Sequence, residues 1–116
     1  MTQVALTKRW AINVTITAGA IVAASTVATG NVSAAWDDTA KTLTLTLAGG
    51  GIAVADAIVK CMPRGVAAAV ATDYVPCLSN ASTATSYVFE ILNLAATPAL
   101  ATPNGIAVEI TPVRDV

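Results

Sequence analysis

The sequence predicts an all-β fold: a single-domain antiparallel β-sandwich, jelly-roll-like, with about eight strands. Several segments alternate apolar and polar residues with the period of an extended chain. Turn residues recur at intervals of about 8–12 residues, and no heptad or longer repeat is present. The 116 residues suit one domain. We expect an N-terminal arm at residues 1–8 and the sandwich at residues 9–116.

Alternation predicts a first strand over Trp10–Thr17, directly after the arm. A second apolar segment spans Ala20–Val27, and Gly30 with the following asparagine marks a turn. A short strand over Asn31–Trp36 then leads into a polar turn. The first third of the chain is therefore expected to be extended.

The clearest strand spans Lys41–Leu47, where three leucines alternate with three threonines. In an extended chain this places every leucine on one face and every threonine on the other. The branched Cβ of threonine also favours strands. The glycines at 49–51 end the strand, because glycine adopts positive φ without steric cost.

The middle of the chain is less regular. Ala53–Met62 is rich in alanine, which permits a helical turn, and Pro63 is expected to close this segment. Two further strands are predicted over Val66–Val70 and Asp73–Leu78. The composition of Ser79–Ser86 indicates a surface loop.

Two alternating strands complete the predicted sandwich. Tyr87–Leu92 places Tyr87 and every second residue after it on one face. Ile106–Thr111 places Ile106 and every second residue after it inward, and it follows an Asn-Gly pair typical of hairpin turns.

The chain carries very few charges for its length. Charged residues make up 11% of the sequence and hydrophobic residues 55%, whereas a soluble domain has roughly 25% charged residues. Such a surface suits a subunit whose faces are covered by copies of itself or by a larger assembly. The net charge of −1 gives no basis for a nucleic-acid partner or an anionic membrane.

One segment imitates a targeting signal. Lys8 and Arg9 precede an uncharged run over residues 10–36. Polar residues interrupt this run with strand periodicity, so we expect a strand there and neither a signal peptide nor a membrane span. Three Asn-x-Ser/Thr matches, at Asn13, Asn31 and Asn80, are interpreted as coincidences in a chain rich in serine and threonine.

The sequence offers no constellation typical of an enzyme. It has no histidine, which removes the commonest general base and the commonest metal ligand. Asp37 and Asp38 are adjacent, so on a strand they point to opposite faces, and we interpret them as a solvated turn. Nothing marks Lys41 or Lys60 as a buried base. The glycine run lacks the Gly-Lys-Ser/Thr ending of a phosphate-binding loop. We therefore expect no catalytic residue, cofactor or metal.

The two cysteines do not form a metal motif, because Cys61 and Cys77 are 16 positions apart and lack other soft ligands. We interpret them as small buried apolar residues. A disulfide is the alternative, and it requires an oxidising compartment.

Five residues are candidates for contacts between subunits: Trp10, Trp36, Arg64, Lys8 and Arg9. Each tryptophan serves either in the core or as an interface anchor, where tryptophan is enriched. Arg64 begins a predicted turn, from which it could reach an acidic residue of a neighbouring subunit.

Several motifs occur in a recognisable order: Lys-Arg-Trp at residues 8–10, Asn-Val-Ser-Ala-Ala-Trp at 31–36, Lys-Thr-Leu-Thr-Leu-Thr-Leu at 41–47, Met-Pro-Arg-Gly at 62–65, Tyr-Val-Phe-Glu-Ile-Leu-Asn at 87–93 and Gly-Ile-Ala-Val-Glu-Ile at 105–110. Over residues 8–112 this order resembles the C1q-like jelly roll of tailed-bacteriophage fibre heads and related virion proteins. The chain differs from them in its many alanines, and it lacks the histidines and metal-binding loops of some such trimers.

This resemblance implies a homotrimeric virion structural protein. A short arm without a shaft favours a capsid decoration (cement) protein on the capsid exterior, with the major capsid protein as its partner. The alternative is a trimeric tail- or head-fibre domain that binds the host-cell receptor. A bacterial cell-surface or secreted binding module is a third interpretation, and an enzyme is the last.

Overall fold

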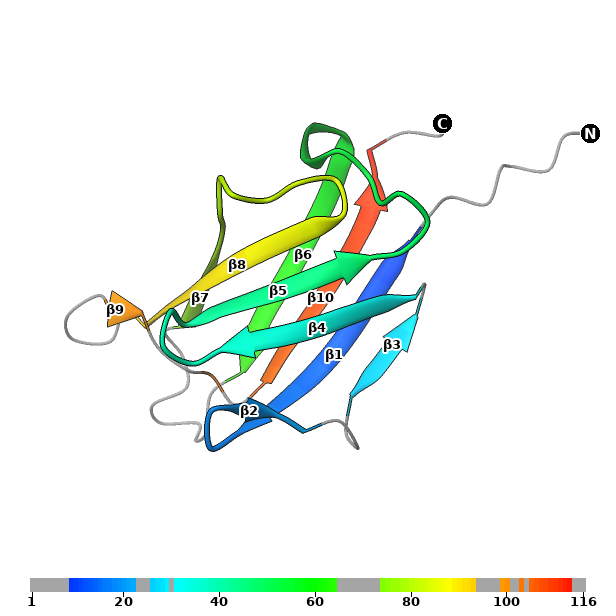
Figure 1. Ribbon diagram of the computed structural model, residues 1–116. Helices are drawn as coiled ribbons and strands as arrows, with labels where there is room; N and C mark the ends of the chain where they lie inside the picture. The colour runs from blue at the N-terminus through cyan, green and yellow to red at the C-terminus, as the bar shows by residue number, and fades with distance from the viewer. Residues whose placement is uncertain are drawn as a thin grey trace, which may run out of the picture.

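Antiparallel pairing between the first and last strands sets the architecture. The computed structural model describes residues 9–22, 26–29, 31–64, 74–93, 99–100, 103 and 105–113. In this part of the chain two antiparallel five-stranded sheets pack face to face, and Figure 1 shows one sheet lying across the other. The predicted all-β sandwich is confirmed.

The first sheet has the order β2-β1-β10-β6, and β3 also pairs with β1. Its strands are β1 (Trp10–Thr17), β2 (Ala20–Ile21), β3 (Val27–Thr29), β6 (Ala57–Arg64) and β10 (Gly105–Pro112). In the register of β1 with β10, Trp10 lies opposite Ile110 and Val14 opposite Ile106. These partners are far apart in the sequence, so this sheet forms only when the two ends of the chain meet.

The second sheet has the order β4-β5-β8-β7, and β9 pairs with β8. Its strands are β4 (Val32–Asp37), β5 (Thr42–Leu47), β7 (Tyr74–Leu78), β8 (Ser86–Asn93) and β9 (Ala99–Leu100). The alternating leucines of β5 all point inward, as their spacing predicts, and the threonines point outward or lie half-buried. Strand β8 contributes Tyr87, Phe89 and Ile91 to the same layer.

The core fills the space between the two sheets. Its fully buried members come from β1, β4, β5, β8 and β10: Trp10, Ile12, Val14, Ile16, Val32, Leu43, Leu45, Leu47, Tyr87, Phe89, Ile91, Ile106, Val108 and Ile110. Burying one such aliphatic or aromatic side chain contributes about 1.5–3 kcal/mol. The described residues contain no buried polar side-chain atom without a hydrogen-bond partner.

The segment over residues 53–64 differs in part from expectation. The helical turn is present as a short 3₁₀ turn, η2 (Val54–Asp56), but the chain then enters strand β6. Pro63 lies inside this strand, opposite Ile106, and does not close it. The reason is position, because β6 is an edge strand and proline is tolerated at sheet edges. The strand predicted over Val66–Val70 lies outside the described residues.

The connection from β5 to β6 is held by a tyrosine inside the core. The Tyr87 hydroxyl donates a hydrogen bond to the Ile52 carbonyl at 2.6 Å. The Ile52 amide in turn donates to the Ala84 carbonyl at 2.9 Å. These bonds bring Gly51 so close that a Cβ there would lie 1.8 Å from the Ala84 oxygen. All three glycines at 49–51 have positive φ, as their sequence predicts.

We expect Gly51→Ala to destabilise the protein far more than Gly50→Ala. Both glycines have positive φ, but a Cβ at Gly50 meets nothing within 4 Å. The conformational cost, about 1–2 kcal/mol for alanine in this region, is therefore common to both variants. The collision with Ala84 is specific to Gly51, and it should add at least about 2 kcal/mol. Urea denaturation of the two variants would measure the difference, and equal losses would contradict the described contact.

Candidate functional site

A trough lies on the outer face of the first sheet. Its central positions are on β1 and β10, and its flanks are on β3 and β6. Strand register aligns two rows of outward side chains across these four strands. One row is Val27–Asn13–Ala107–Met62 and the other is Thr29–Ala11–Glu109–Lys60. These residues line a depression of about 350 Å³, which we call the trough.

The trough follows from the sizes of these side chains. On the two central strands the small Ala11 and Ala107 alternate with Asn13 and Glu109, and the low parts of the floor lie over the two alanines. Val27 and Met62 on the flanking strands are larger, and each is 69% exposed. Exposed apolar side chains that border a depression are a feature that interaction sites share.

Charged side chains are confined to one row of the trough and its end. The Arg9 Nε lies 2.6 Å from the Glu109 carboxylate, and both groups are partly exposed to solvent. Lys60 lies opposite Glu109 in the register of β10 with β6. Among the described residues Lys60 makes no ion pair, so this end of the trough carries one excess positive charge.

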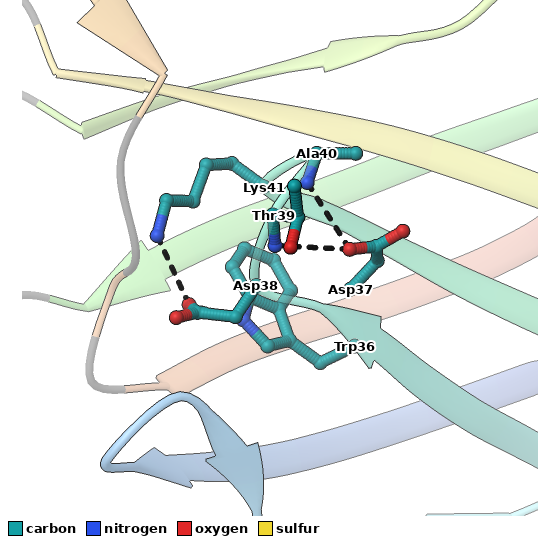
Figure 2. A network of polar contacts seen from close by, with 6 residues as sticks. All are labelled: Trp36, Asp37, Asp38, Thr39, Ala40 and Lys41. Carbon is teal, nitrogen blue, oxygen red and sulfur yellow. Dashed lines mark hydrogen bonds and ion pairs between the residues drawn. The ribbon is translucent and has the colours of Figure 1, made fainter.

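A second polar feature is the turn between β4 and β5, which Figure 2 shows. Asp37 accepts hydrogen bonds from the backbone amides of Thr39 and Ala40, at 2.9 and 3.1 Å. Asp38 accepts one from the Trp36 indole at 3.0 Å and pairs with Lys41 at 3.1 Å. The two carboxylates thus bind different groups of the turn itself.

Asp38 also contacts the β1–β2 hairpin. A Cβ on Gly19 would lie 2.7 Å from an Asp38 carboxylate oxygen, and the positive φ of Gly19 also favours glycine there. The turn between β4 and β5 therefore lies beside the β1–β2 hairpin. Its carboxylates serve the fold, and neither lines the trough.

Where the structure describes them, the residues predicted to contact other subunits lie in different environments. Trp10 is 4% exposed and belongs to the core. Trp36 is half-buried against that core. Arg9 lies at the end of the trough. Arg64 ends β6, and Lys8 lies outside the described residues.

The two cysteines face different environments. Cys61 points toward the core from β6, and burial raises the pKa of its thiol to about 12. Cys77 is exposed on β7. Both are free thiols in this structure, so the disulfide alternative is not realised within one chain.

The described residues contain no group of three or more side chains suited to hold a metal ion. In the same part of the chain, no helix is long and apolar enough to cross a membrane.

Comparison of the chain with family models, with curated proteins and with solved structures found no match.

Sequence reasoning missed most of the trough. It placed Ala107 and Glu109 on the outer face of their strand, but it did not single out Ala11, Val27 or Met62. The available signal was the small outward residues of two alternating strands, Trp10–Thr17 and Ile106–Thr111. These small residues can be assigned to one site only when β1 and β10 are known to be neighbouring strands.

Replacing Asp38 with alanine should destabilise the turn more than replacing Lys41 with methionine. Asp38→Ala removes a charged acceptor from the indole, and we expect a loss of about 1–2 kcal/mol. Lys41→Met removes an ion pair at the surface, and such a pair is worth about 0–1 kcal/mol. Chemical denaturation would rank the two variants. Because Asp38→Ala removes the Lys41 ion pair as well as the indole contact, a loss for Lys41→Met equal to that for Asp38→Ala would show that the ion pair, not the indole contact, anchors the turn.

Stability should fall as the pH rises from about 9 to 12. The Cys61 thiol has a folded pKa of about 12 against an ordinary value of 9.0. Above pH 9 the unfolded chain therefore loses this proton while the folded chain keeps it, which favours unfolding. Burial, and then the Asp56 carboxylate, also raise the pKa of Tyr87, which acts in the same direction.

The measurement is denaturation across this pH range for the wild type and for Cys61→Ala. The variant should show a flatter decline with rising pH. In a parallel test at pH 8, a thiol reagent should modify Cys77 well before Cys61. Equal reactivity of the two thiols would contradict their described exposure.

Proposed function

We propose that the protein is a non-catalytic decoration (cement) protein of a phage capsid, acting as a homotrimer that binds the major capsid protein on the outside of the shell. The observation that carries the proposal is the scarcity of charge on both outer sheet faces. The order of sequence motifs that resembles virion jelly rolls supports it further.

The second outer face is even less charged than the trough. On the outward positions of β4, β5 and β8 the described side chains are mainly serine, threonine, alanine and valine. The charged residues among them are Glu90 and, at the end of β4, Asp37. A flat face of short side chains can pack against protein at a low entropic cost, because alanine and other small residues lose little rotamer freedom.

A capsid presents the same binding site many times. Each decoration subunit then needs only modest affinity, because the contacts of one trimer act together. This suits a subunit with two sparsely charged faces, one that meets its own copies and one that meets the shell.

The proposal predicts a particular oligomeric state and a particular partner. Sedimentation equilibrium of the purified protein should give three times the 11.6 kDa of one chain. Cosedimentation with empty shells of the phage that carries this gene should be saturable, and electron microscopy should place the protein on the shell surface. A trimer that binds host cells and ignores shells would favour the receptor-binding fibre domain. A stable monomer that ignores both would remove the proposal.

A further inference from the structure

We propose that the trough is the docking site for one amphipathic α-helix of a protein partner, seated with an acidic side chain against Lys60. Under the proposed function, on which the identity of the partner rests, this helix belongs to the major capsid protein. The existence of the site itself rests on the geometry and charge of the trough.

The width of the trough suits a helix. Its flanking strands, β3 and β6, are separated by three strand spacings in the order β3-β1-β10-β6, or about 14 Å. An α-helix with its side chains is about 10–12 Å across. An extended segment would instead bind at a sheet edge, where unpaired backbone groups are available. The backbone under the trough is already paired between β1, β10 and β6.

The floor and walls match the apolar stripe of such a helix. Ala11 and Ala107 let an incoming backbone approach closely. Val27 and Met62, each 69% exposed, would then flank its apolar side chains and lose their contact with water. Burying apolar area of this kind is the main source of favourable binding energy in a helix-binding groove.

The positive charge of Lys60 distinguishes among the molecules that could occupy the trough. Arg9 and Glu109 neutralise each other, and Lys60 is left without an ion pair among the described residues. A second copy docked trough to trough would bring another excess positive charge, and the chain's own arm would bring Lys8. A partner with an acidic residue at the edge of its apolar stripe is the complementary choice, because like charges in contact oppose binding.

The first test uses a synthetic helical peptide of about 14 residues. It carries leucine and alanine on one face, glutamine on the other and one glutamate at the border. Its matched control replaces that glutamate with lysine. In titrations of the isotope-labelled protein, the glutamate peptide should shift amide signals in β1, β3, β6 and β10, and should bind at least about tenfold tighter than the control. Shifts confined to the second sheet would overturn the proposal.

Ala107→Leu tests whether peptide binding depends on the shape of the trough or only on its hydrophobicity. The substitution makes the face more apolar but fills the floor of the trough. We expect it to weaken binding of the glutamate peptide by about tenfold or more. The matched control is Ala35→Leu on the outer face of β4, which is exposed and should leave binding unchanged. Binding by Ala107→Leu that equals or exceeds the wild type would show that no shaped site exists.

Lys60→Glu provides a second variant, at an exposed position on the edge strand β6. It should reverse the preference, so that the lysine peptide binds more tightly than the glutamate peptide. An unchanged preference would overturn the role of Lys60. A chain lacking residues 2–7 that binds the peptide about tenfold tighter would place the arm in the trough and would also overturn the proposal.

The same variants on capsid shells distinguish this inference from the proposed function. A wild-type protein that binds the glutamate peptide but no shells would support the trough and remove the decoration role. If the wild type, Ala107→Leu and Lys60→Glu bound shells equally, the decoration role would be supported and the trough would be removed as the docking site. Loss of shell binding in both trough variants, with Ala35→Leu unaffected, would support both.

Discussion

The antiparallel pairing of β1 with β10 is the constraint on which the rest of the structure depends. It joins the two ends of the chain, and its register fixes which side chains face the core. Ile12 and Val108 then point inward while Ala11 and Ala107 point outward. A slip of one residue in either strand would exchange these two sets, exposing the core residues and destroying the trough at once. The core and the candidate site are thus two consequences of one register.

Local alternation carried enough information to locate the principal strands. The strand predicted over Trp10–Thr17 has those bounds in the structure, and β5 and β10 were predicted with their inward faces correct. Pro63, Arg64 and the glycine after them were predicted to close the segment over residues 53–62, but Pro63 itself lies within β6, which ends at Arg64. The difference is that alternation is a property of neighbouring residues, whereas tolerance of a proline depends on whether the strand is at an edge, which only the assembled sheet decides.

The candidate site was far less visible in the sequence, for a related reason. Its floor joins residues near position 11 to residues near position 107, and its flanks come from two further strands. Both tryptophans were predicted as candidate interface anchors because tryptophan is enriched at interfaces, but Trp10 is part of the core. The trough is shaped instead by alanines. A small side chain forms a depression only where larger side chains lie beside it. That comparison needs the strand order, which a pattern along the chain does not contain.

The placement of two prolines affects how readily the open edges of the two sheets pair with other molecules. Pro63 lies in β6 and Pro76 in β7, and each strand is the outermost member of its sheet. An open strand edge is a template on which another molecule can extend the sheet, and this hazard grows as molecules become sparsely charged and closely packed. Proline has no backbone N–H group that could donate a hydrogen bond to an added strand. Each proline therefore removes one hydrogen-bond donor from the edge on which it lies, which makes that edge a poorer template for pairing with another chain.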